Sequence, residues 1–243
     1  MPDRVALVTG ASRGIGRAIA ERLGADGAAV VVNYRSDADA AAKVVTAIER
    51  SGGQAVAAQA DAGEQDELRG LFDVAEREYG GIDTVVCNVG VARFAPIAET
   101  SDEDFDTIFR TNTRGTFLAL REAARRVREG GRIVVVSSGT AVTARPGSGV
   151  YGASKAAGDA LVRTLAQELG PRRITVNSVL PGATDTEAFA AGLPEQARAE
   201  LVARAPLGRI GRPDDIADVV GFLASDASRW ITGQTIHAGG GMF

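Results

Sequence analysis

Short apolar segments alternate with longer amphipathic stretches along most of the chain. Several of the apolar segments are rich in β-branched residues, which predicts strands buried on both faces of a sheet. The predicted strands cover residues 5–8, 29–32, 55–58, 84–87, 133–136, 175–180 and 235–237. The longer stretches have helical periodicity, and the predicted helices cover residues 14–23, 37–50, 64–79, 102–127, 151–169 and 213–223.

This alternation of strand and helix is typical of βαβ units, in which right-handed crossovers join parallel strands. The sequence therefore predicts an α/β fold with a doubly wound, seven-stranded parallel sheet and helices on both faces. No linker rich in proline, glycine or serine divides the chain, so we expect residues 1–243 to form a single domain. Residues 184–204 have the weakest pattern and are interpreted as a flexible loop over a binding site.

Composition and charge narrow the class of protein. Hydrophobic residues make up 45% of the chain and charged residues 24%, and no apolar run is long enough to span a bilayer. The net charge of -4 disfavours nucleic-acid binding. Cys87 is the only cysteine and His237 the only histidine, so no internal disulfide forms and no metal site is predicted. The N-terminus lacks the pattern of a signal peptide, and we expect a cytoplasmic protein.

A glycine-rich turn with the pattern TGxxxGxG joins the first predicted strand to the first predicted helix. Glycines permit a tight turn and let backbone N–H groups approach a pyrophosphate, while the helix N-terminus adds partial positive charge. The alternative is an ordinary strand-to-helix turn, but this context favours phosphate binding. The predicted contacts in the turn are Gly10, Ser12, Arg13, Gly14, Ile15 and Gly16.

Tyr151 and Lys155 are four residues apart in a predicted helix, which puts both on one face. A phenol is a poor base near neutral pH, but an adjacent ammonium favours its phenolate, so we expect Lys155 to lower the pKa of Tyr151. On its own, such a pair is more typical of an exposed helix surface. Ser138 changes this interpretation because it ends the fifth predicted strand, where α/β sheets build ligand sites. Ser137 points to the opposite side, so Ser138 is preferred.

Together, the TGxxxGxG turn, Ser138 and the YxxxK spacing resemble the short-chain dehydrogenase/reductase family, and the resemblance covers nearly the whole chain. It implies a Rossmann-type fold that binds a dinucleotide and transfers hydride between a nicotinamide and a carbonyl carbon. By resemblance Ser138, Tyr151 and Lys155 are catalytic, with Tyr151 as the acid/base. Asn112 would be the fourth catalytic residue, at a local kink that frees the backbone to bind water. A surface amide is the alternative for Asn112.

The end of the second predicted strand indicates which dinucleotide is bound. An acidic residue there would contact the ribose hydroxyls of NAD and repel the 2′-phosphate of NADP. By resemblance Tyr34 occupies the acidic position and Arg35 follows it, while the first acid is Asp37. Arg35 and Arg13 would hold the phosphate, so we expect NADP(H) as the cofactor. The alternative is that both arginines are merely solvated.

The resemblance implies further cofactor contacts. Asp61 and Ala62 match a pair beside the adenine, although a helix cap is the alternative for Asp61. The remaining implied contacts are Asn88, Gly90, Pro181, Gly182, Thr184 and Thr186. Cys87 and Val89, on either side of Asn88, depart mildly from the pattern of the family, and Thr184 replaces a residue that is usually apolar.

We therefore expect an NADPH-dependent reductase of ketone or aldehyde carbonyls, in which Tyr151 moves the proton of the oxygen. The pattern is closest to the 3-oxoacyl-[acyl-carrier-protein] reductase-like group, and arginines around Arg125 and Arg172 could dock an acidic carrier protein. The alternatives are reduction of another small ketone and a catalytically silent, NADP(H)-binding regulatory protein. The resemblance also implies a homotetramer; no nucleic-acid or membrane partner is expected.

Overall fold

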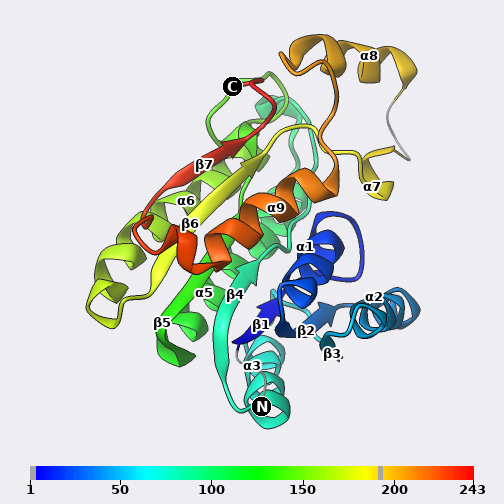
Figure 1. Ribbon diagram of the computed structural model, residues 1–243. Helices are drawn as coiled ribbons and strands as arrows, with labels where there is room; N and C mark the ends of the chain where they lie inside the picture. Colours follow the sequence, from blue (N-terminus) through cyan, green and yellow to red (C-terminus); the bar gives the residue numbers. More distant parts are fainter. Residues whose placement is uncertain (1–3, 191–193) are drawn as a thin grey trace.

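The computed structural model describes residues 4–190 and 194–243, with a seven-stranded sheet at the centre (Figure 1). The strands are β1 (Arg4–Val8), β2 (Ala28–Tyr34), β3 (Gln54–Gln59), β4 (Ile82–Cys87), β5 (Val127–Val136), β6 (Thr175–Pro181) and β7 (Thr235–Ala238). Their order is β3-β2-β1-β4-β5-β6-β7, and every neighbouring pair is parallel. The strand order reverses between β1 and β4, and sheets of this kind bind ligands at the carboxyl ends of the strands near such a point.

Helices cover both faces of the sheet, and each face has its own hydrophobic core. One face carries α1 (Gly14–Ala25), α2 (Ala38–Arg50) and α9 (Pro213–Ala224), and the other carries α3 (Gln65–Tyr79), α5 (Gly115–Arg126) and α6 (Gly149–Leu169) (Figure 1). Val8 and Val30 point into the first core, and Leu7 and Val31 into the second. Alternate strand residues point to opposite faces, so a strand covered on both sides is apolar throughout.

The predicted fold class is confirmed, and each predicted strand overlaps an observed one. β5 differs most, because it begins at Val127 instead of residue 133. Its pairing with β4 starts at Ile82 opposite Val127 and then shifts register before Thr84 meets Arg132. This irregular part of β5 contains charged residues and glycines, so it lacks the apolar pattern that predicts a strand.

The predicted helix over residues 102–127 is divided into three segments. α4 (Asp102–Ile108) leads into a π-helical segment, η2 (Phe109–Arg114), which leads into α5. The kink predicted around Asn112 is therefore present as a widened helical turn. The short 3-10 turns are η1 (Ile97–Glu99), η3 (Gly139–Ala141), η4 (Gly170–Arg172) and η5 (Asp226–Ser228). Of the helices in the described residues, none has the length and apolar character needed to cross a membrane.

The sequence predicts an irregular loop over residues 184–204, but this stretch contains two helices. These are α7 (Glu187–Ala190) and α8 (Glu195–Arg204), and α8 lies away from the sheet, at the upper right of Figure 1. None of the residues of α8 is buried. A helix that packs no face against a core needs no apolar stripe, which explains its weak periodicity. Residues 191–193 of the predicted loop lie outside the described residues.

Candidate active site

The glycine turn after β1 is shaped by its glycines. Gly10 has a φ of 61°, a left-handed conformation that residues with a Cβ atom rarely adopt. A Cβ atom at Gly16 would overlap the carbonyl oxygen of Gly10, so only glycine lets α1 begin so close to the turn. The turn therefore presents its backbone at the carboxyl edge of the sheet.

Polar side chains hold this turn in place, and one of them, the buried Asn33, is not marked by the sequence pattern. The side-chain oxygen of Asn33 accepts the N–H of Gly10 at 3.0 Å. Asn88, an expected cofactor contact, donates its amide to the carbonyl oxygens of Thr9 and Gly10 at 3.0 and 3.1 Å. The Thr9 hydroxyl accepts the N–H of Asn88 at 2.9 Å. Asn88 therefore ties the end of β4 to the turn.

The first turn of α1 has the features of an anion site. Arg13 is its N-cap residue, yet no side chain caps the helix and the first turn contains no acid. By contrast, α2 is capped by Asp37, whose Oδ1 accepts the N–H of Ala40 at 2.9 Å. An uncapped N-terminus leaves backbone N–H groups for another acceptor and favours negative charge. The backbone of residues 12–16 therefore fits the pyrophosphate of a dinucleotide.

Two cations lie near the glycine turn: Arg13 at the start of α1 and Arg35 just after β2. Arg13 and Arg35 are exposed, and neither guanidinium pairs with an acid of the described residues. The carbonyl oxygen of Arg35 accepts the side-chain amide of Gln59 at 3.0 Å, which holds the backbone after β2, next to the half-buried Tyr34. Asp37, the first acid after β2, is engaged at the N-terminus of α2. Arg13 and Arg35 therefore suit a further phosphate group, beside the pyrophosphate that fits the start of α1.

Asp61 and Ala62 follow β3 at the same edge. Asp61 Oδ1 accepts the N–H of Gly63 at 2.9 Å, and its own N–H donates to Glu67 Oε2 at 2.7 Å. The N-cap residue of α3 is Glu64, so Asp61 is not the cap of that helix. Ala62 is buried in the core.

The segment after β6 reaches back to the glycine turn. The hydroxyl of the buried Thr184 donates to the carbonyl oxygen of Gly182 at 3.0 Å. A Cβ atom at Gly14 would lie 3.2 Å from Thr186 Cγ2, which places Thr186 against the start of α1. The structure thus brings together two segments that are far apart in the sequence.

Ser138 and Tyr151 meet at the carboxyl edge, one after β5 and the other in the first turn of α6. Ser138 Oγ accepts the N–H and the hydroxyl of Thr140 at 3.2 and 2.9 Å. Its own proton is therefore available for donation. Burial raises the pKa of Tyr151, and a hydrogen bond with Ser138 acts in the opposite direction.

The direction of the Tyr151 pKa corrects a prediction. The sequence predicts that Lys155 lowers it, whereas in the structure burial raises it above its ordinary value. The Nζ atom of Lys155 donates instead to the carbonyl oxygen of Val136 at 3.0 Å. Burial raises this pKa because it removes the water that would stabilise a phenolate, and Lys155 is not among the groups that oppose the rise. Tyr151 is therefore protonated at neutral pH, as a proton donor must be.

Lys155 is buried beneath these hydroxyls. A Cβ atom at Gly90 would lie 2.8 Å from its Nζ atom, so Gly90 leaves room for the ammonium group. Burial lowers the pKa of Lys155 to about 8, while Asp159 and Cys87 raise it. The group is close to the point at which it loses its charge under mildly alkaline conditions.

Asn112 is buried in η2 and bonds across the site, which excludes the surface alternative. Its Oδ1 atom accepts the N–H of Val91 at 2.8 Å. Its amide donates to the carbonyl oxygen of Val91 at 2.9 Å and to Ser154 Oγ at 3.0 Å. Asn112 therefore joins the loop after β4 to α6.

Known proteins resemble the chain over nearly its whole length. The family model "Enoyl-(Acyl carrier protein) reductase" matches residues 10–243. A versicolorin reductase of Emericella nidulans is 46% identical, over 100% of this chain and 97% of its own. The solved structure of the angucycline C-6 ketoreductase LanV with bound NADP has a TM-score of 0.94 at 42% identity, covering 99% of this chain and 96% of that one. A short-chain dehydrogenase from Burkholderia cenocepacia J2315 in complex with NADP has a TM-score of 0.93 at 40% identity, covering 98% and 97%. The chain belongs to the short-chain dehydrogenase/reductase family.

As a short-chain dehydrogenase/reductase, the protein is an oxidoreductase whose cofactor is a nicotinamide dinucleotide. The uncapped start of α1 and the glycine turn fit that cofactor. Within residues 4–190 and 194–243, no cluster of histidine, cysteine and acidic residues is arranged to hold a metal ion.

An apolar rim of the short-chain dehydrogenase/reductase site has no signature in the sequence. The ring of Phe94 is 60% exposed and packs edge-on against Tyr151, with 5.5 Å between ring centroids. Ile97 is exposed beside it, and a Cβ atom at Gly149 would lie 3.1 Å from its side chain. Phe94 comes from the irregular loop after β4 and Ile97 begins the short turn η1, so no periodicity marks them.

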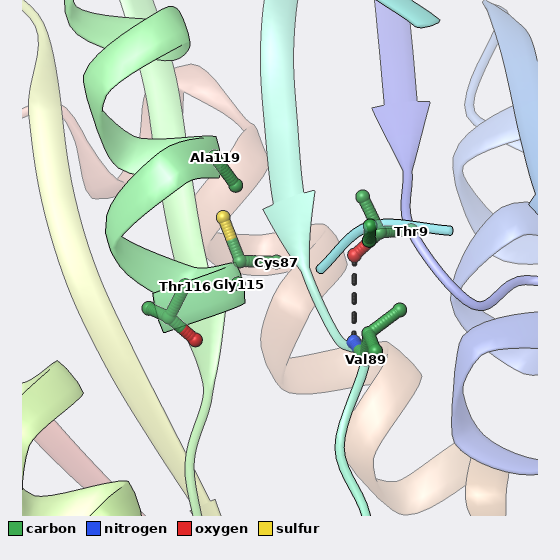
Figure 2. Close-up of a pocket in the computed structure, with 7 residues that line it drawn as sticks. Thr9, Cys87, Val89, Gly115, Thr116 and Ala119 are labelled. Atoms are coloured by element: carbon green, nitrogen blue, oxygen red, sulfur yellow. Dashed lines mark hydrogen bonds between the residues drawn. The ribbon is translucent and has the colours of Figure 1, made fainter. Parts of the chain in front are cut away.

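A small cavity lies behind the glycine turn, between β1, β4 and α5, as Figure 2 shows. It is lined by Thr9, Ala62, Cys87, Val89, Gly115, Thr116 and Ala119. The hydroxyl of Thr9 accepts the N–H of Val89 at 3.4 Å, the dashed line in Figure 2. Its volume of about 10 Å³ is at the lower limit for one water molecule, so it is no substrate site. Burial raises the pKa of Cys87 to about 12, which leaves a neutral thiol at this wall.

Proposed function

We propose that this protein is an NADPH-dependent reductase of ketone or aldehyde carbonyls, with residues 1–243 acting as one dinucleotide-binding and catalytic domain. The observation that carries the proposal is the cluster of Ser138, Tyr151 and Lys155 at the carboxyl edge, beside the glycine turn. A hydroxyl donor, a protonated phenol and a buried cation are the groups that carbonyl reduction uses.

Each member of the cluster has a distinct role in the proposed reaction. Bound NADPH supplies the hydride that adds to the carbonyl carbon. Tyr151 donates its proton to the carbonyl oxygen, and Ser138 orients that oxygen with its hydroxyl proton. Lys155 holds the nicotinamide ribose, and Asn112 links Lys155 to a water that returns the proton. The product is an alcohol, and the reverse direction is alcohol oxidation.

The preference for NADPH rests on charge. Arg13 and Arg35 are exposed cations without an acidic partner in the described residues, and Asp37 is engaged in capping α2. We propose that the two guanidiniums bind the 2′-phosphate. LanV and the Burkholderia enzyme, both solved with NADP, support this choice. The remaining residues proposed to hold the cofactor are Gly10, Ser12, Gly14, Ile15, Gly16, Tyr34, Asp61, Ala62, Asn88, Gly90, Tyr151, Lys155, Pro181, Gly182, Thr184 and Thr186.

The substrate that we propose is an apolar ketone that contains a ring. Phe94 and Ile97 present exposed apolar surface at the side of Tyr151, which suits a flat hydrophobic molecule. The versicolorin reductase and the angucycline ketoreductase among the relatives support this substrate class.

A carrier-bound 3-oxoacyl thioester is the second candidate, and the arginines weaken it. Arg126 pairs with Asp73 and Glu76 of α3. Arg172 donates to backbone carbonyl oxygens within the chain, and Arg173 pairs with Glu129. Because these cations are engaged, little of the basic surface is free to dock an acidic carrier.

We propose further that the enzyme is a cytoplasmic homotetramer. Phe117 on α5, Phe222 on α9 and Trp230 after η5 are large apolar side chains exposed to solvent. Such side chains are typical of protein interfaces.

An NADPH-oxidation screen tests the activity with ring-containing ketones, small ketones, aldehydes and 3-oxoacyl thioesters. We expect the highest kcat/KM with ring-containing ketones. Tyr151→Phe should lower kcat by about 10²- to 10⁴-fold, the usual contribution of a general acid, while NADPH affinity should fall far less than kcat. Unchanged turnover in this variant, or a wild-type enzyme that oxidises NADPH with none of these carbonyls, would contradict the proposal.

The same enzyme preparation tests the cofactor. Arg35→Ala should weaken NADPH binding by about tenfold, since a hydrogen bond to a charged group contributes about 1.5–3 kcal/mol. NADH, which lacks the 2′-phosphate, should bind the variant and the wild type alike. Arg50→Ala removes an exposed arginine from the end of α2 and is the control. Equal weakening of both dinucleotides would contradict the assignment.

A further inference from the structure

Asp159 is a buried carboxyl group that the proposed reaction does not use. It lies one helical turn after Lys155 on α6, and only 5% of its surface is exposed. The hydroxyl of Ser137 donates to Asp159 Oδ2 at 2.9 Å. Asp159 Oδ1 has no hydrogen-bond partner of good geometry among the described residues. A carboxyl group is rarely placed in a core unless its charge has a use.

The bond from Ser137 connects this carboxyl group to the proposed catalytic residues. Ser137 lies between Val136, whose carbonyl oxygen accepts the Lys155 Nζ, and Ser138, which bonds Tyr151. The Ser137–Asp159 bond therefore pins the end of β5 to α6 at the point where the active site is assembled. A shift of either element would move Ser138 relative to Lys155.

The charges around Lys155 make Asp159 its electrostatic partner. Cys87 faces it from β4, but burial raises the pKa of that thiol to about 12 and leaves it neutral. Asn112 faces the same space from η2 and carries no charge. Tyr151, on α6, is protonated at neutral pH because burial raises its pKa. Asp159 is thus the carboxylate that offsets the cost of burying the ammonium group.

The pKa of the Asp159 carboxyl group lies above its ordinary value, and the neighbours of the group limit that rise. Burial raises the pKa of its carboxyl group, while Ser178, Ser137, Lys155 and the exposed Arg163 lower it. Ser178 Oγ lies near the carboxyl group but makes no hydrogen bond of good geometry in the described part of the chain. Four neighbours therefore act against the effect of burial.

We propose that Asp159 is a positioning residue for the reduction: its carboxylate keeps the Lys155 ammonium charged and, through Ser137, holds the end of β5 against α6. This inference rests on the proposed function for its kinetic consequences, but the charge state of Lys155 can be measured without turnover. Asp159 acts through Lys155 and Ser137 and does not touch the substrate.

Asp159→Asn tests the charge while keeping the size of the side chain and an acceptor for Ser137. Without the carboxylate, the pKa of Lys155 should fall by about one unit, the usual effect of one nearby charge. NADPH affinity and kcat should then be near wild type at mildly acidic pH and about fivefold lower near pH 8, where the lysine is about half charged in the wild type and mostly neutral in the variant. A merely structural role would lower both values at every pH.

A direct titration separates this inference from the proposed function. NMR of the lysine side chain, assigned with Lys155→Met, reports the pKa of Lys155 in wild type and in Asp159→Asn without any substrate. A lower pKa in the variant supports the inference even if no ketone is turned over. An unchanged pKa would overturn it even if the enzyme reduces ketones.

Two matched variants complete the experiment. Glu168→Gln removes an exposed carboxylate from the same helix and should leave the pKa of Lys155 unchanged. Asp159→Glu restores the charge and should return the pH profile toward that of the wild type. If Asp159→Asn does not fold, carboxyl-carbon NMR of the wild type tests the inference instead. We expect an ionised Asp159 carboxylate at neutral pH, and a protonated carboxyl group would overturn the inference.

Discussion

At the scale of single residues, the buried cation of Lys155 lowers the stability of the folded protein. Burial brings its pKa from the ordinary 10.5 to about 8, so the folded protein holds this proton less tightly than the unfolded chain does. The carbonyl oxygen of Val136 and the carboxylate of Asp159 offset only part of the cost. A charge that is retained at such a cost is typical of a functional residue.

We predict that the free energy of unfolding of the wild type rises, relative to Lys155→Met, between about pH 8 and pH 10.5. In this window the unfolded chain binds more protons than the folded one, so raising the pH favours the folded state. The whole change corresponds to about 3 kcal/mol, from a shift of about 2.5 pKa units. Urea unfolding of both variants across the window measures it.

The control for this prediction is Lys43→Met, which removes an exposed lysine from α2. It measures how removal of an exposed lysine affects unfolding across the same pH window. A constant difference between wild type and Lys155→Met would show that Lys155 titrates normally.

At the scale of elements, the π-helical segment η2 connects the loop after β4 to α6. Asn112 satisfies both backbone groups of Val91 and bonds Ser154, so one side chain connects the loop after β4, the π-helical segment and α6. The kink was predictable because an amide is a poor interior helix residue. Its partner Val91 was not, because 21 residues separate them.

Asn112→Ala should destabilise the protein by about 1–3 kcal/mol, the cost of leaving buried polar groups without partners. Turnover should also fall, because the loop that carries Phe94 is released next to Tyr151. Thermal unfolding and NADPH oxidation measure the two effects. Thr111→Ala, in the same segment, should change stability by less than about 0.5 kcal/mol, as surface-like substitutions do. Equal effects of the two substitutions would refute the role of the Asn112 bonds.

At the scale of the whole molecule, the position of β4 between β1 and β5 assembles the site. Asn88, after β4, supports the glycine turn on the β1 side. Gly90, two residues later, leaves room for Lys155 on the β5 side. The reversal of strand order at this point therefore brings the cofactor turn and the proton donor to one place.

Assembly is a property of the whole molecule, and we predict a tetramer in solution. Light scattering during size-exclusion chromatography should give four times the mass of one 25.1 kDa chain. Phe117→Glu should lower that mass, because a charge on α5 opposes burial of this face. Val142→Glu alters an exposed apolar residue near the active site and should leave the mass unchanged. A wild type with the mass of a single chain would contradict the prediction.

Much of the fold and part of the site were predictable from local sequence. Buried parallel strands are apolar throughout, so β1, β2, β4 and β6 stand out as short β-branched runs. α8 was not predicted from the sequence because it packs no face against a core. The exposed ring of Phe94 beside the site was not predicted because residues in an irregular loop follow no periodic pattern.

The sequence by itself determined the alternation of strands and helices, the glycine turn and the spacing of Tyr151 and Lys155, because these depend on residues close together in the chain. Only the tertiary structure decided that Asn33 and Asn88 hold the turn and that Ser137 bonds Asp159. It also reversed the expected direction of the Tyr151 pKa. The reason is that burial and hydrogen-bond partners are set by elements from distant parts of the sequence, and burial governs the charge of each group in the site.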